Sequence, residues 1–275
     1  MTGTLSITSN GIGSPNTVSL AGSAEKSLVT HYYRSILSRA PDGPGKIFWE
    51  GEAARVAGLG ANVNEVWYSM AMEFYFGPEY AILSRSNTGF LTDLYNTFFN
   101  RAPDQGGFDF WTTQMAGGMP REGVLANFMF SPEFAFFTQA IFGNPAVRGE
   151  VNVVMDFYRG LLSRLPDSGG FNFYVGQFRA AQCLGSGQVL TQVENISSGY
   201  LNSPEYSARA RTNLQYMADL YNAFLRRGPD LGGIQFYVNQ LATGAKTREQ
   251  VRKDFKVSPE FNLRVNAILG ETCIP

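Results

Sequence analysis

The chain has 275 residues, of which 44% are hydrophobic and 14% aromatic, enough apolar surface for one large folded domain or two ordinary ones. A formal charge of −1 and a pI near 5.9 give no basic face for nucleic acid or for an anionic membrane surface, so we expect neither partner. No apolar run approaches the ~20 residues of a membrane-spanning helix, and we expect no membrane insertion.

The first 26 residues differ in composition from the rest of the chain. Residues 1–26 are rich in Ser, Thr and Gly and are expected to form a flexible leader. The opening stretch MTGTLSITSN has neither a basic nor an apolar signal region, so we expect no cleavable Sec-type signal. No segment of the chain shows convincing alternation of apolar and polar residues, which predicts a protein without β-strands.

From residue 27 on, one pattern occurs four times. Each copy has an Arg-x-Pro-Asp motif with a tyrosine six positions before the arginine, and a Pro-Glu-aromatic triplet follows further along. The triplets are GPEY at 77–80, SPEF at 131–134, SPEY at 203–206 and SPEF at 258–261. The arginines, spaced by 62, 63 and 63 residues, are Arg39, Arg101, Arg164 and Arg227. Self-similarity at a fixed period indicates a repeat architecture.

The spacing inside a copy alternates along the chain. The two prolines of a copy lie 37, 29, 38 and 30 residues apart, so copies one and three share an insertion that copies two and four lack. This alternation predicts a duplicated pair, with a first pair of repeats at 27–147 and a second at 148–275.

The residues around each Arg-x-Pro-Asp motif predict a turn between two helices. Before Arg101, the apolar residues Leu94, Tyr95, Phe98 and Phe99 fall on one helical face. The proline ends that helix, and the following aspartate is a candidate N-cap for the next one. Each Ser-Pro-Glu also indicates a helix start. We therefore predict an all-α fold of four tandem repeats of about 63 residues, each with three or four short helices.

The combined pattern Tyr-x5-Arg-x-Pro-Asp-x2-Gly-x3-Phe/Trp, followed by Ser-Pro-Glu-Phe, resembles the bacterial domain-of-unknown-function family 4214 over about residues 27–265. The resemblance implies helices similar to those of phycobilisome linker domains and of surface-layer anchoring domains that hold lipopolysaccharide. It also implies an extracellular or cell-surface location in a bacterium. The sequence departs from the pattern at Gly77, which replaces serine, at Pro44 and Lys46 in the first loop, and at Gly228 before Pro229.

The repeated motif and its aromatic residues are the candidate ligand-binding groups. Arg101 and Asp104 together could bind a sugar acid or a phosphate, although a capping role for the aspartate explains all four copies without a ligand. In FDFW, Phe108 and Trp111 share a helical face while Phe110 points away, so the helix is either buried on most sides or exposes one ring. The rings that we selected as candidates for stacking on a sugar are Trp49, Trp67, Trp111, Tyr174 and Tyr237.

Nothing in the pattern requires catalysis or a bound metal. The glutamates of the four Pro-Glu triplets could act as a glycosidase pair, but helix starts account for them, and we expect a non-catalytic protein. The loop carboxylates Asp104 and Asp109 lack the alternating oxygens of a calcium loop, and His31 is the only histidine. We expect no metal and no cofactor.

Cys183 and Cys273 are the only cysteines, 90 residues apart. They are either a disulfide that ties down the C-terminal tail or two unrelated thiols, and a disulfide would indicate an oxidising compartment.

These observations lead us to expect a non-catalytic module of a bacterial surface or secreted protein that binds a polysaccharide or lipopolysaccharide, with other surface-protein subunits as further candidate partners. A protein scaffold is the alternative, and an extracellular glycosidase comes third.

Overall fold

The computed structural model of the protein describes residues 2–7, 16–21 and 27–274. Strands β1 (Thr2–Ile7) and β2 (Asn16–Ala21) pair antiparallel, with Leu5 opposite Val18. The prediction of a chain without strands is wrong for these two segments, where a few alternating residues suffice for a hairpin. The rest of the predicted flexible leader, residues 1, 8–15 and 22–26, lies outside the described residues.

Every described element after the hairpin is a helix, which confirms the prediction of an all-α repeat fold. We call residues 27–147 the first half and residues 148–275 the second half. The helices of the first half are α1 (Val29–Leu37), α2 (Gly43–Gly58), α3 (Asn64–Phe76), α4 (Pro78–Ile82), α5 (Asn87–Phe99), α6 (Gln105–Ala116), α7 (Arg121–Met129) and α8 (Pro132–Phe142). Those of the second half are α9 (Gly149–Leu162), α10 (Ser168–Gln182), α11 (Ser186–Leu201), α12 (Pro204–Ala208), α13 (Asn213–Leu220), the π-helical turn η1 (Tyr221–Leu225), α14 (Leu231–Ala242), α15 (Arg248–Lys256) and α16 (Pro259–Leu269).

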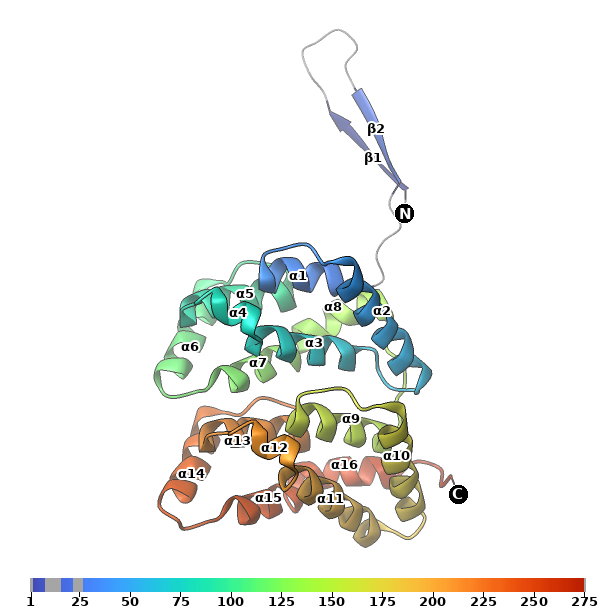
Figure 1. Ribbon diagram of the computed structural model, residues 1–275, viewed down its shortest axis with the longest axis vertical. Coiled ribbons are helices and arrows are strands. Elements are labelled where there is room, and N and C mark those ends of the chain that lie inside the picture. The colour runs from blue at the N-terminus through green and yellow to red at the C-terminus, as the bar shows by residue number, and fades with distance from the viewer. Residues whose placement is uncertain (1, 8–15, 22–26, 275) are drawn as a thin grey trace.

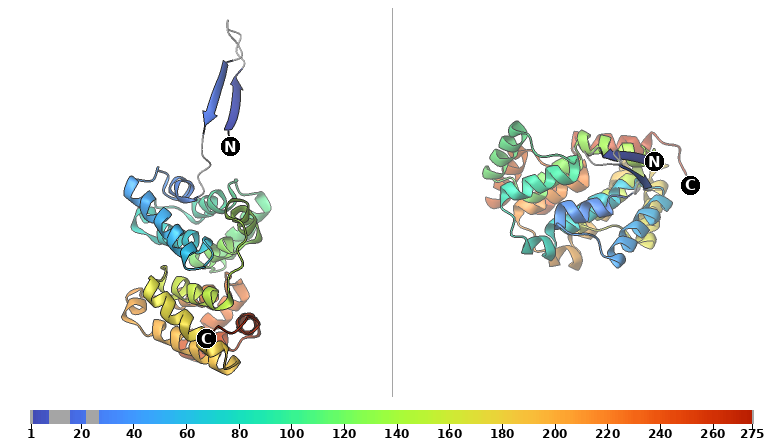
Figure 2. Two further views of the ribbon diagram at one scale, coloured as in Figure 1. Left: turned by 90° about the vertical axis from the view of Figure 1, so that its right-hand side faces the viewer. Right: turned by 90° about the horizontal axis from the view of Figure 1, so that it is seen from above.

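The two halves form two layers stacked in the same orientation (Figure 1). Helices α2 and α10 lie at one edge of the stack, and α6 and α14 lie at the opposite edge. The view from above in Figure 2 shows the second-half helices beneath those of the first half. Helices α3 and α7 of the first half contact α9 and α13 of the second.

Each half has an aromatic core built from corresponding residues. In the first half the rings of Phe98 and Phe134 are fully buried, with centroids 4.9 Å apart. In the second half Phe224 and Phe261 take the same places with centroids 5.3 Å apart. Burial of one such ring contributes about 1.5–3 kcal/mol, so these clusters are what holds the short helices of a half together.

A buried ionic network joins the two halves. Arg159 of α9 forms ion pairs with Glu65 of α3 and with Asp156, and all three side chains are buried. Arg226 bonds the carboxylates of Glu65 and Asp156 at 2.6 Å each, and Arg264 reaches the second oxygen of Asp156. Burial alone would raise the pKa of Asp156, but the charges of the three arginines hold it below its ordinary value.

Aromatic rings of the first half cover this network. The guanidinium of Arg159 lies 4.9 Å from the centroid of the Phe130 ring and 5.5 Å from that of Tyr68. From the second half, the π-helical turn η1 places Asn222 so that its Oδ1 accepts a hydrogen bond from Arg159 Nε at 3.0 Å. Ion pairs and packed aromatic rings therefore both hold the two halves together at this interface.

Candidate functional site

The repeated motif is built around an arginine that bonds a glutamate far along the chain. In the second repeat, Arg101 Nε donates to Glu133 Oε1 at 2.8 Å and Arg101 Nη2 donates to Oε2 at 3.0 Å. The guanidinium also lies 5.0 Å from the centroid of the Tyr95 ring. The other three repeats form the same pair, and the partners are Arg39 with Glu79, Arg164 with Glu205 and Arg227 with Glu260. This partner was not predicted from the sequence, although the arginine and the glutamate recur together four times.

The aspartate of each motif caps the following helix, as predicted. Asp104 Oδ1 accepts a hydrogen bond from the Gly107 backbone N–H at 2.9 Å, and Arg101 Nη1 donates to Asp104 Oδ2 at 3.1 Å. The same cap occurs at Asp42, Asp167 and Asp230. Hydrogen bonds from Gly107 and from Arg101 hold the pKa of Asp104 below its ordinary value.

The third residue of each capped helix is a glycine, and the tyrosine of the motif requires it. A Cβ atom on Gly107 would lie 2.1 Å from Tyr95 Oη, closer than any real contact. The corresponding distances at Gly45, Gly170 and Gly233 are 2.2, 2.2 and 2.3 Å.

Arg101 and Asp104 are two of the predicted ligand-binding residues. In the structure their polar groups form hydrogen bonds within the repeat, with Glu133, with the Gly107 N–H and with each other.

The Ser-Pro-Glu helix starts also agree with the prediction. The hydroxyl of Ser131 accepts a hydrogen bond from the Phe134 backbone N–H at 3.1 Å, and Ser203 and Ser258 cap in the same way. Gly77 at the same place gives its helix no side-chain cap.

The five aromatic candidates lie deeper than we expected. Trp49 and Trp67 have exposed fractions of 4% and 0%, so the prediction that they offer a free face is wrong. Trp111, Tyr174 and Tyr237 are half-buried against the core. The centroid of the Trp111 ring, for example, lies 5.4 Å from that of Phe128. Such contacts hold the capped helix to its own half.

At one position of the motif, all four repeats expose a phenylalanine instead. Each directly precedes the half-buried or buried Trp or Tyr of its helix and meets that ring edge-on, with centroids 5.0–5.1 Å apart. The four are Phe48 (56% exposed), Phe110 (54%), Phe173 (60%) and Phe236 (56%). Isolated exposed apolar residues are common, but an exposed ring at the same place in four repeats is not expected from chance alone. The recurrence of an aromatic pair in the sequence was the signal for them.

The helices that carry these rings lie in two pairs at the two edges of the stack. Phe48 and Phe173 belong to α2 and α10, and Phe110 and Phe236 belong to α6 and α14 at the opposite edge (Figure 1). Polar side chains adjoin them in sequence, since Asp109, Asn172 and Gln235 each precede an exposed ring. Each edge of the stack therefore has two helices with an exposed ring, one helix from each half, and in three of the four helices a polar residue precedes the ring.

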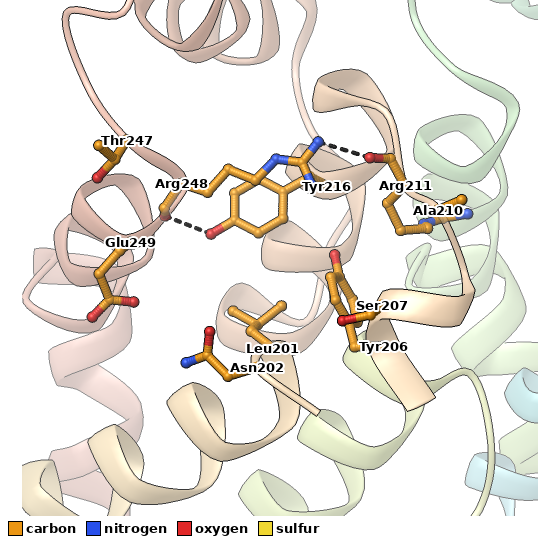
Figure 3. Close-up of a pocket in the computed structure, with 10 residues that line it drawn as sticks. All are labelled: Leu201, Asn202, Tyr206, Ser207, Ala210, Arg211, Tyr216, Thr247, Arg248 and Glu249. Carbon is orange, nitrogen blue, oxygen red and sulfur yellow. Dashed lines mark hydrogen bonds between the residues drawn. The ribbon is translucent and has the colours of Figure 1, made fainter. Parts of the chain in front are cut away.

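A cavity of about 440 Å³ between α12, α13 and α15 has a different character (Figure 3). Arg248 lies 5.0 Å from the centroid of the Tyr216 ring and donates to the Arg211 carbonyl oxygen at 2.7 Å. Tyr216 Oη donates to the Arg248 carbonyl oxygen at 2.6 Å. In the first half Arg121 repeats this arrangement over Phe90, with the centroid at 5.0 Å. Because the cation is already bonded and the arrangement recurs, we interpret it as a structural link between helices.

The structure joins Cys183 and Cys273 in a disulfide, with Cα atoms 5.4 Å apart. The bridge holds the C-terminal tail against the second half. Gln182 Nε2 donates to the carbonyl oxygens of Ile268 and Glu271 at 2.7 Å each, and the Gly149 N–H donates to Glu271 Oε1 at 2.7 Å. The tail thereby covers the beginning of α9.

No three His, Cys, Asp or Glu side chains in the described ranges are grouped so that they could hold a metal ion. Nor does any helix among the described residues have the length and apolarity to span a bilayer.

Comparison with known proteins gives a family but no described activity. No curated protein and no solved structure matches this chain. The family model "Domain of unknown function (DUF4214)" matches twice, at residues 71–137 and 197–265. Each match runs from one Pro-Glu triplet through the Arg-x-Pro-Asp turn to the next triplet, so the family model matches once in each half and each match spans parts of two of the four repeats. This protein is a member of the DUF4214 family that carries the domain in tandem.

Proposed function

We propose that the protein is a non-catalytic extracellular module of a bacterial surface or secreted protein, and that it binds a cell-surface polysaccharide. The observation that carries this proposal is the exposed phenylalanine that occurs at the same place in all four repeats. A phenyl face stacks on the C–H groups of a sugar ring, and adjacent amide or carboxylate groups can accept its hydroxyls.

The arrangement of the rings suits a repetitive ligand. Each edge carries one exposed ring from each half, so one long chain can contact both rings of an edge, and linked weak contacts raise the overall affinity well above that of one site. A polysaccharide is repetitive in the same sense, whereas a small single sugar would occupy one ring only.

The disulfide supports an extracellular location. The Cys183–Cys273 bridge lies at an exposed site, and exposed disulfides persist in oxidising compartments outside the cytosol.

A binding experiment with bacterial polysaccharides tests the proposal. The purified protein would be titrated by isothermal calorimetry with a panel of capsular, exopolysaccharide and lipopolysaccharide glycans, with release of reducing ends followed in parallel. We expect binding without turnover, and loss of binding when Phe48, Phe110, Phe173 and Phe236 are all replaced by alanine. Phe136→Ala is the matched control, because Phe136 is 71% exposed on α8 but has no counterpart ring in the motif. Silence across the whole panel would refute the proposal.

A protein scaffold is the second candidate, and the docking of the two halves favours it. The first half already recognises the second through Glu65, Arg159 and the covering rings, so a repeat pair is able to bind a repeat pair. Binding of other surface-protein subunits, with no response to glycans, would support this alternative.

A further inference from the structure

The first half has a pocket of about 460 Å³ on the side that faces away from the second half. Its residues occupy the same places in the first half as the interface residues of α9 and η1 occupy in the second. It lies between α1 and α5, and we call it the α1–α5 pocket. The side chains that matter for its chemistry are His31, Arg34, Arg85, Asn96 and Asn100.

The duplication aligns this pocket with the interface network. Tyr33 corresponds to Tyr158 and Tyr95 to Tyr221 in the motifs of the two halves. By the same offsets, Arg34 corresponds to Arg159 and His31 to Asp156. Asn96 and Asn100 correspond in turn to Asn222 and Arg226. The backbone agrees, since Asn100 and Arg226 both end their helices in the left-handed conformation, with φ of 51° and 52°.

In the second half this place already binds a carboxylate. Arg159 and Arg226 both form ion pairs with Glu65, which enters from the first half. The Glu65 side chain therefore acts as a carboxylate ligand that another helix brings to the two arginines.

Arg34 has neither of the two carboxylate partners that Arg159 has. His31 stands at the place of Asp156, and its Nε2 is bonded to the Thr97 carbonyl oxygen at 2.7 Å. Arg85 is the other cation of the pocket, and it is paired with Asp93 at 3.0 Å. Within the described part of the chain, Arg34 makes no hydrogen bond or ion pair, and the side chains of Asn96 and Asn100 make no hydrogen bond. One positive charge and two amides are therefore open to a ligand.

The pocket is poorly suited to a second protein face of the same kind. At the interface Gly228 lies so close to Asn127 that a Cβ there would be 2.3 Å from its side chain, and the counterpart of Gly228 is Ala102. The second guanidinium that stacks on Tyr68 and Phe130 is also lost, since Asn100 replaces Arg226. These changes disfavour a helix with aromatic rings and leave space for a smaller, polar acid.

We propose that the α1–α5 pocket binds the carboxylate of an acidic sugar, a uronic acid unit of the polysaccharide, with Arg34 as the cation. Asn96 and Asn100 donate and accept hydrogen bonds with the hydroxyls of that sugar. This inference rests on the proposed function and names its ligand class, an acidic polysaccharide.

The test compares acidic polysaccharides with the same chains after methyl esterification, which masks the carboxylate and keeps the sugar. Polygalacturonate, polyglucuronate and alginate would be titrated calorimetrically against the wild type, Arg34→Gln and the control Lys253→Gln, an exposed cation on α15. We expect the wild type and the control to prefer an acid form by about ten-fold or more. Arg34→Gln should remove this preference and leave the affinity for the ester unchanged.

The outcomes separate this inference from the proposed function. Binding of neutral glycans through the phenylalanines, with no preference for acid forms, would overturn the inference alone. So would binding of poly-L-glutamate that depends on Arg34 when no uronate binds, since the occupant would then be an acidic protein. Failure of every polysaccharide to bind would refute the proposed function and this inference with it.

Discussion

Arg101 and Glu133 lie 32 residues apart and form two parallel hydrogen bonds, Nε to Oε1 at 2.8 Å and Nη2 to Oε2 at 3.0 Å. Through this pair the turn after one helix is fixed to the start of another, and the guanidinium covers the ring of Tyr95. Since every repeat contains the pair, it is the common link of the motif.

Replacing Arg101 by lysine should lower the free energy of unfolding by about 0.5–1 kcal/mol, because an ammonium group cannot form two parallel bonds and the pair is partly exposed. Urea denaturation measures the change. Arg34→Lys is the control and should leave stability unchanged, so equal losses in the two variants would contradict a specific role for the pair.

Adjacent glycines provide a sharper test of the motif. Gly107→Ala should cost about 1–3 kcal/mol, because the new Cβ would meet Tyr95 Oη and the Tyr95 ring is packed between Phe99 and Phe128. Gly106→Ala should be neutral or stabilising, since its nearest atom would be 3.7 Å away. Adding Tyr95→Phe to Gly107→Ala should recover part of the loss, and a failure to recover would show that the hydroxyl contact is not the cause.

Local chemistry explains which features of the fold could be predicted from the sequence. The caps at Asp104 and Ser131 each depend on a residue three positions away, and their recurrence in four and in three repeats marks them in the sequence. The Arg–Glu pairs join residues 32–41 positions apart, and local patterns do not rank partners over such distances.

The candidate rings illustrate a different limit. Helical geometry places Phe110 away from Phe108, but it does not say which of the two faces the neighbouring helices will cover. The buried ionic network between the halves could not be predicted from the sequence at all. Asp156 has His31 as its counterpart, so the network shows no repetition.

Removing the central carboxylate of that network should be strongly destabilising. Asp156→Asn leaves Arg159, Arg226 and Arg264 without their common partner, and loss of one member of a buried ion pair costs about 3–5 kcal/mol. Asp109→Asn, on the exposed surface of α6, should change stability by less than about 0.5 kcal/mol. Denaturation curves of the two variants give the comparison, and similar midpoints would contradict the importance of the network.

The stability should depend on pH through Glu194. Hydrogen bonds from the buried Arg252 and from Lys256 lower the pKa of Glu194 from 4.5 to about 2. A lowered carboxyl pKa stabilises the fold above the unfolded value of 4.5, and this contribution is lost as the pH falls toward 2. Unfolding of the wild type and Glu194→Gln should therefore differ at pH 6 and converge toward pH 2. A difference that stays constant with pH would rule out this linkage.

Opening the disulfide should reduce stability substantially. Closing a loop of 90 residues contributes about 4–5 kcal/mol in the chain-entropy model. Unfolding free energies with and without reductant measure the effect, and Cys183→Ser with Cys273→Ser should match the reduced wild type. An unchanged free energy after reduction would show that the contacts of Gln182 and Gly149 alone hold the tail.

The central claim is that the exposed phenylalanines bind a repetitive glycan, and stepwise removal of the rings tests it most directly. The affinity for the polysaccharide identified in the panel would be measured for each single Phe→Ala variant, for the Phe48/Phe173 and Phe110/Phe236 pairs, and for all four changes together. We predict unchanged melting temperatures, a modest loss of affinity for each single variant on the edge that binds the chain, and a larger loss for the pair on that edge. Wild-type affinity in the variant that lacks all four rings would contradict the claim.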